Sequence, residues 1–184
     1  MGLTLIKEDG TARSDANAYA NAADGDAYHD GHLYATDWAL ASVGKKEAAL
    51  VMATRLIDAQ YQFGGSRASE TQALQWPRVN CLDPDKAATG VPLSLWLADT
   101  FVASNVVPKA VRDATCEMAR ELLIADRTAA PPGEGLKYAN VGSTQTGYDK
   151  SDTRPVISHV AQAMLAKFGA LIKSKSGAVQ LVRT

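Results

Sequence analysis

The chain has 184 residues, of which 46% are hydrophobic and 21% are charged, and its formal net charge is −1. The length allows one domain with a sizeable core, and the composition is ordinary for a soluble globular protein. The near-zero net charge excludes a protein that holds nucleic acid through a large basic surplus. We therefore predict a single domain over residues 1–184.

The cysteines and the N-terminus indicate the compartment. Cys81 and Cys116 are the only two cysteines, and the first ten residues lack a basic leader with a long apolar core. We expect no signal peptide, a reducing cytoplasm and unpaired thiols. No window approaches the roughly 18 uninterrupted apolar residues of a membrane span, so we predict no membrane partner.

Local patterns predict three elements in the N-terminal third. A short apolar strand is expected over residues 3–6, and Asn21 is a suitable N-cap for a short helix that ends near residue 30. Ser42 is the next N-cap, for a helix over residues 43–63 that Gly64 and Gly65 end. Its apolar face has helical spacing and consists of Ala49, Met52, Ala53, Leu56 and Phe63.

A compact motif follows this helix, with a Trp side chain before a rigid proline and a cation. We interpret it as a structural hook that fixes the helix against a loop; its residues are Gln72, Leu74, Trp76, Pro77 and Arg78. Trp76 is expected in the core and Arg78 beside a carboxylate. The alternative places Arg78 on a partner surface or near DNA.

Residues 80–107 are interpreted as a loop insertion that begins with two turn signals. It carries an apolar cluster that is either local core or an exposed binding surface, formed by Leu93, Leu95, Trp96, Leu97, Phe101 and Val102. Pro108 then opens a helix expected to end near Ala129. Its buried face is predicted to be Val111, Ala114, Thr115, Met118, Ala119 and Leu122.

The last quarter is predicted to combine extended and helical segments. Residues 136–141 and 144–148 suggest a β-hairpin, in which Tyr138 and Tyr148 either stack on bases or pack between strands. A helix is expected over 155–172, with Val156, Val160, Met164 and Leu171 inward. A C-terminal arm over 173–184 contains a strand at 177–183. The predicted fold class is mainly α: a helical bundle with extended arms, a small β-hairpin and a C-terminal strand.

No motif marks a catalytic or metal site. His29 and His32, with Asp26 and Asp30, imitate a metal cluster, but a closed zinc site needs four ligands, so we expect a solvated helix end. His159 has no triad partners, and Gly64 to Arg67 lack the Lys-Ser/Thr ending of a phosphate loop. We predict no enzyme activity, no catalytic residues, no metal and no cofactor.

The order of several segments resembles a known family. The matching residues are 15–19 with 27–28, 46–50 with 53–58, the hook at 72–78, 107–117 and 179–183. Together they are similar to the phage head–tail connector (head completion or adaptor) proteins, some of which are labelled DnaT-like single-stranded DNA-binding proteins. The segment between Arg78 and Pro108 is longer and more apolar than that pattern, and residues 18 and 21–25 replace a more regular helix start.

The resemblance implies a structural role in the virion neck, between capsid and tail. The expected partners are further copies in a ring, a dodecamer by family analogy, then the portal, the next neck or tail protein, and genomic DNA passing through the lumen. Residues expected to bind partners are Leu95, Trp96, Phe101, Tyr138, Tyr148, Val179, Leu181 and Arg183. A terminal strand added to another chain's sheet would supply main-chain hydrogen bonds.

The alternative hypothesis is a single-stranded DNA-binding protein of DnaT-like type. It predicts an arginine-lined groove and a steep salt dependence. The residues named as facing DNA are Arg55, Arg67 and Arg112, and the wider groove would draw on Arg78, Arg120 and Arg154.

Overall fold

The computed structural model describes residues 2–86, 100–129, 138–141, 144–147 and 154–172. Its helices are α1 (Ala22–His29), α2 (Thr36–Leu40), α3 (Val43–Gln60), α4 (Lys109–Ile124) and α5 (His159–Leu165). Its strands are β1 (Tyr61–Phe63), β2 (Ser66–Arg67), β3 (Arg78–Val79), β4 (Tyr138–Val141), β5 (Thr144–Gly147) and β6 (Gly169–Leu171). Three antiparallel two-stranded sheets pair β1 with β6, β2 with β3 and β4 with β5.

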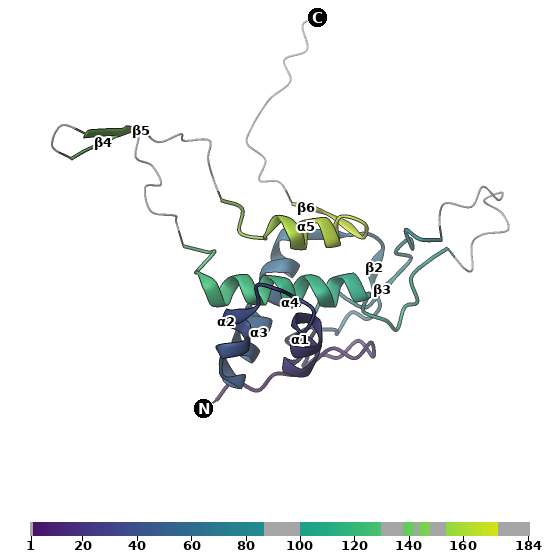
Figure 1. Ribbon diagram of the computed structural model, residues 1–184. Helices are drawn as coiled ribbons and strands as arrows, with labels where there is room; N and C mark the ends of the chain where they lie inside the picture. The colour runs from purple at the N-terminus through teal and green to yellow at the C-terminus, as the bar shows by residue number, and fades with distance from the viewer. Residues whose placement is uncertain (1, 87–99, 130–137, 142–143, 148–153, 173–184) are drawn as a thin grey trace, which may run out of the picture.

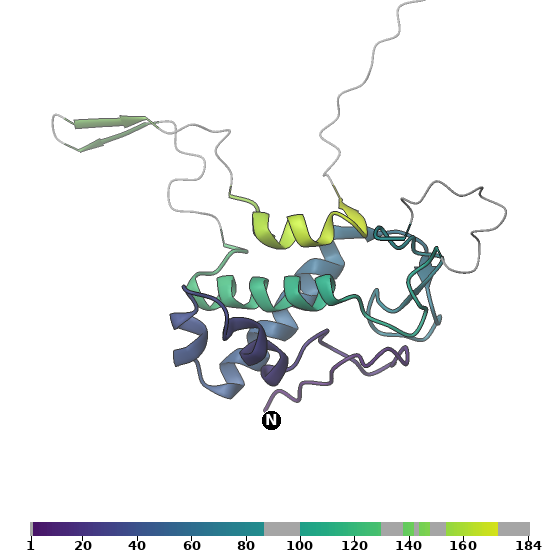
Figure 2. The same cartoon turned by 45° about the vertical axis from the view of Figure 1, so that its right-hand side comes forward.

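Helix α4 is the centre of the molecule. It runs between α5 on one side and α1 to α3 on the other (Figures 1 and 2). Its buried side contains the predicted residues Val111, Ala114, Thr115, Met118 and Ala119, while Leu122 is partly buried. The helix ends at Ile124, five residues before the predicted end, and Pro108 is its N-cap rather than its first residue.

The predicted start of α1 is confirmed. The Asn21 side chain accepts a hydrogen bond from the Asp24 backbone, and the Asp24 side chain accepts one from the Asn21 backbone. This reciprocal capping box satisfies two amide groups that a helix start leaves unpaired. Helix α2 was not predicted, because its five residues have no side-chain cap; Trp38, buried against α1, holds it in place.

Two predicted helices extend too far. Helix α3 ends at Gln60, because Tyr61 to Phe63 pair with Gly169 to Leu171 as strands. Helix α5 covers 159–165 only, and its inner face was predicted in part: Val160 is 51% exposed, whereas Met164 and Leu171 pack partly buried against the core. The residues buried there are Ile157, Ala161 and Leu165.

The N-terminal residues do not form the predicted strand. Residues 3–6 are irregular, and the backbone makes a single bridge between Lys7 and Ala18. The adjacent turn is organised by the buried carboxylate of Glu8, which accepts hydrogen bonds from the backbone amides of Gly10, Ala12 and Arg13. Within the predicted strand, the Ile6 amide donates to the Asn17 side chain rather than to a neighbouring strand.

The hook lies inside the molecule. Trp76 is fully buried, and its ring meets the rings of Phe63 and Phe168 edge to face. Arg78 is 4% exposed and donates hydrogen bonds to the carbonyls of Phe63, Gly64 and Gly65. The expected carboxylate partner is therefore wrong, as is the alternative of a surface cation. Gln72 donates to the carbonyls of Leu74 and Pro77, closing the loop on itself.

The predicted fold class is confirmed as mainly α with small β elements. The hairpin forms over β4 and β5 with Tyr138 opposite Gly147. Other predictions lie outside the described residues: the arm over 173–184, its strand at 177–183, and the part of the apolar cluster that falls at 93–97. Among the described residues, no helix is both long enough and apolar enough to span a membrane.

Candidate nucleic-acid interface

The three arginines predicted to face DNA lie on three different elements. Arg55 is exposed on α3, and Arg67 is exposed on β2, where it donates to the Gln72 carbonyl. Arg112 is partly buried on α4 and lines a cavity. Two candidates for the wider groove do not fit it, because Arg78 is buried in the hook and Arg120 is held by Glu117 and Glu121 on its own helix.

Few of the residues predicted to bind partners fall in the described part of the chain. Phe101 is half-buried and its backbone bridges to Leu82, while Tyr138 begins β4. The others lie outside the described residues: Leu95, Trp96, Tyr148, Val179, Leu181 and Arg183.

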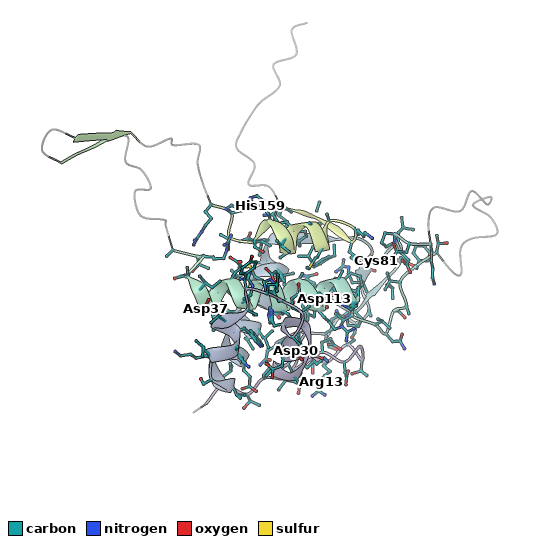
Figure 3. All side chains as sticks on the ribbon, viewed as in Figure 1. Arg13, Asp30, Asp37, Cys81, Asp113 and His159 are labelled. Atoms are coloured by element: carbon teal, nitrogen blue, oxygen red, sulfur yellow. The ribbon has the colours of Figure 1, made fainter. Side chains whose placement is uncertain are left out.

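The cavity at Arg112 lies between α1 and α4 and has a volume of about 210 Å³. Three of its lining residues come from α1 and four from α4: Asp24, Ala27 and Tyr28, and then Lys109, Arg112, Asp113 and Cys116. Spacings of three and four place each set on one helical face, and the packing of the two helices turns those faces toward one another. Figure 3 labels Asp113 on the α4 wall.

Both carboxylates of the cavity are already in ion pairs. Asp24 Oδ2 lies 2.6 Å from Lys7 Nζ and also accepts the Asn21 amide, and Asp113 Oδ2 accepts from Lys109 one turn earlier. Burial raises the pKa of Asp24, but the hydrogen bonds from Lys7 and Asn21 outweigh it, so the pKa lies below its ordinary value. Asp24 is therefore ionised at neutral pH.

The other polar groups of the cavity are donors. Arg112 Nε is buried and has no hydrogen-bond partner in the described part of the chain. Burial raises the pKa of Tyr28 to about 12, so its hydroxyl stays protonated. Burial likewise raises the pKa of Cys116 to about 12, which leaves a thiol rather than a nucleophilic thiolate. The site can bind a polar ring or head group through donors and acceptors, without a cysteine nucleophile.

The histidines beside the cavity do not form the solvated helix end that the sequence suggested. His29 is buried, its ring lies 4.8 Å from that of Trp38, and its Nε2 is 3.2 Å from the Cys116 carbonyl. His32 Nε2 is 3.8 Å from Glu117. Burial lowers the pKa of His29, so it packs as a neutral ring. The described residues contain no group of three or more metal-ligating side chains.

Comparison with family models gives one match, over residues 3–184, to the family described as "Putative DnaT-like ssDNA binding protein". The chain belongs to this family. Searches of curated proteins and of solved structures found no match.

The family match corrects the main functional prediction. A structural head–tail connector was expected, with a ring beneath a portal and a docked neck or tail protein, but the matching family is described by single-stranded DNA binding. Nothing in the match refers to a virion, a portal or a tail. The connector hypothesis is therefore wrong on this finding, and the match agrees with the alternative.

Proposed function

We propose that this protein binds single-stranded DNA and is not an enzyme. The observation that carries the proposal is the family match over nearly the whole chain. Tight non-specific binding needs cations that are free to meet phosphates, together with ring surfaces on which bases can stack. The distribution of basic side chains says how strong such binding can be.

Many described cations are already engaged with carboxylates of the same molecule. Lys46 pairs with Asp26, Arg127 with Glu121, and Lys167 with Asp85. Arg55 differs, since it stands on an exposed stripe of α3 that also contains Ala48, Met52 and Ala59 at helical spacing. Because Arg55 is exposed, its guanidinium is accessible to a phosphate.

The cavity between α1 and α4 supplies the second contact. Lys109 stands at its rim with a side chain that is 76% exposed, and Arg112 reaches into it beside Tyr28. Arg55 and Arg112, together with Lys109 once a phosphate displaces its partner Asp113, would neutralise about two or three phosphates. That number corresponds to a salt slope of about −1.5 to −2 for a single strand. We expect micromolar rather than nanomolar binding.

The test is fluorescence anisotropy of a labelled oligo-dT titrated with the protein at several salt concentrations, with a duplex of equal length as competitor. Micromolar binding that weakens with salt along this shallow slope, and that the duplex competes for poorly, supports the proposal. Absence of binding at tens of micromolar in low salt overturns it. Equal affinity for the duplex overturns the single-strand preference.

A further inference from the structure

We propose that the cavity between α1 and α4 accepts one unstacked nucleobase of the bound strand, with guanine preferred. The proposal rests on the proposed function and deepens it, because it adds a base preference to binding that phosphate contacts alone would leave independent of sequence. The residues that carry it are Asp24, Tyr28, Lys109, Arg112 and Asp113.

Charge argues for a base rather than a phosphate inside the cavity. Two cations, Lys109 and Arg112, and two carboxylates, Asp24 and Asp113, line the cavity, and Lys7 pairs with Asp24 from outside the lining. A phosphate placed between two carboxylates would be repelled by both, at distances where Coulomb energies are large. A neutral ring with donors and acceptors on its edges meets no such penalty. Lys109, at the rim, remains suited to the neighbouring phosphate.

Both a hydrogen-bond donor and hydrogen-bond acceptors at the cavity remain available to a ligand. Arg112 Nε is a buried donor without a partner in the described structure. Among the described residues, the hydrogen bonds and ion pairs of the two carboxylates all end on Oδ2, so Oδ1 of Asp24 and Oδ1 of Asp113 can act as acceptors. Buried polar groups are normally satisfied, so the unpartnered Arg112 donor indicates a missing partner. The Asp24 and Asp113 side chains are partly exposed, and they add acceptors at the same cavity.

Guanine fits this set best among the bases. Its O6 and N7 form a two-acceptor edge that arginine binds in bidentate fashion. Its N1–H and N2–H₂ groups form an adjacent two-donor edge, which a carboxylate can accept. Cytosine, adenine and thymine each lack one of these paired edges. Tyr28 lines the same cavity, and an aromatic ring there offers a stacking surface for an unstacked base.

The experiment compares oligo-dT strands that are identical except for one central dG, dA or dC, as competitors of a labelled all-dT strand. We expect the dG strand to bind about tenfold more tightly than all-dT, which is the discrimination of one good bidentate contact. Arg112→Gln should abolish the preference, measured as the ratio of dG-strand to all-dT affinity within the variant, and should also weaken all-dT binding, because Arg112 is one of the cations proposed to meet phosphate. Equal affinity of all four strands for the wild type would overturn the base preference while leaving the proposed function in place.

Two further variants protect the test against misfolding and non-specific charge effects. Ala27→Leu fills the cavity from an exposed helix position and should abolish the dG preference without changing the charge. Arg13→Gln removes an arginine that pairs with Asp15 on the N-terminal loop, and the preference should survive it. Retention of the preference in Arg112→Gln and Ala27→Leu would overturn the assignment to this cavity.

A further competition experiment distinguishes binding of a base within a strand from binding of a free nucleotide. Unlabelled dGMP is titrated against the labelled dG strand, and we expect it to compete at least tenfold more weakly, because it lacks the neighbouring phosphates. Competition by dGMP as strong as that of the dG strand would overturn the strand as the ligand. Failure of every strand to bind would instead count against the proposed function itself.

Discussion

The hydroxyl of Tyr19 donates a 2.5 Å hydrogen bond to Oδ1 of Asp58, and the same hydroxyl accepts one from the backbone amide of Trp76. The other carboxylate oxygen of Asp58 accepts the amide of Gln75. One buried pair, contributed by the N-terminal segment and α3, thus holds the backbone of the hook. The hook's position depends on a carboxylate that is largely removed from water.

Asp58 is expected to make the protein more stable in mild acid. Burial raises its pKa to about 6 from 3.8, despite the hydrogen bonds from Tyr19 and Gln75. The folded state therefore retains a proton that the unfolded state loses, and stability falls as the pH rises from about 4 through 6. The contribution is on the order of 3 kcal/mol. Asp58→Asn should lack this slope in urea unfolding between pH 4 and 7.

The control for Asp58 is Asp15→Asn, which changes an exposed carboxylate. Its unfolding free energy should follow that of the wild type over the same pH range. Parallel pH curves for the wild type and Asp58→Asn would contradict the assignment of the slope to this residue.

Arg78 is expected to tolerate no conservative replacement. Its guanidinium donates to the carbonyls of Gly64 at 2.6 Å, Gly65 at 2.8 Å and Gln75 at 3.0 Å. A lysine cannot present donors in that planar arrangement, so Arg78→Lys leaves buried carbonyls unpaired and should cost about 2–4 kcal/mol. Chemical denaturation of the wild type and of Arg78→Lys measures this loss in the free energy of unfolding. Arg55→Lys, at an exposed position, should stay within about 0.5 kcal/mol, and similar losses for both variants would refute the hook's role.

Glu8 is expected to be required as a carboxylate rather than as an amide. It accepts three backbone amides, through Oε1 from Gly10 and Ala12 and through Oε2 from Arg13. Glu8→Gln turns an NH₂ group toward at least one of these amides, which should cost about 1–3 kcal/mol. Thermal unfolding reports the loss. Glu70→Gln, an exposed counterpart, should leave the melting temperature unchanged.

Two glycines in helices should respond in opposite ways to alanine. A Cβ at Gly25 would lie 2.3 Å from the Trp38 ring, whereas one at Gly44 would meet nothing within 4 Å. We expect Gly25→Ala to destabilise by about 1–3 kcal/mol, because overpacking exceeds the gain in helix propensity. Gly44→Ala should stabilise by a few tenths to about 1 kcal/mol. Unfolding midpoints compare the two, and a stabilising Gly25→Ala would show that Trp38 moves freely.

Sequence patterns were sufficient where the determinants are local. The capping residue Asn21 marks the start of α1, spacings of three and four mark the inner face of α4, and Gly142-Ser143 separates the hairpin strands. Each of these signals acts within one turn of helix or one pair of strands. The end of α3 had no such signal, because Tyr61 to Phe63 become a strand only through a partner about a hundred residues away.

The sequence likewise indicated some residues of the candidate site and missed others. Arg112 was named from sequence as facing DNA, and the spacing of Lys109 and Asp113 already marks an i, i+4 pair on one helical face. Asp24 and Tyr28 were missed, since they stand on a helix about 85 residues earlier and look like ordinary surface residues.

The sequence by itself determined the helical character of the chain, the inner face of α4 and the weak overall charge. The tertiary structure alone decided which faces meet. Packing α1 on α4 gathers two carboxylates, a guanidinium and an aromatic ring around one cavity. The fold also turns Arg78 from a candidate surface cation into a buried donor to four backbone carbonyls. The reason is that burial and hydrogen-bond pairing depend on neighbours in space, whereas periodicity records neighbours along the chain.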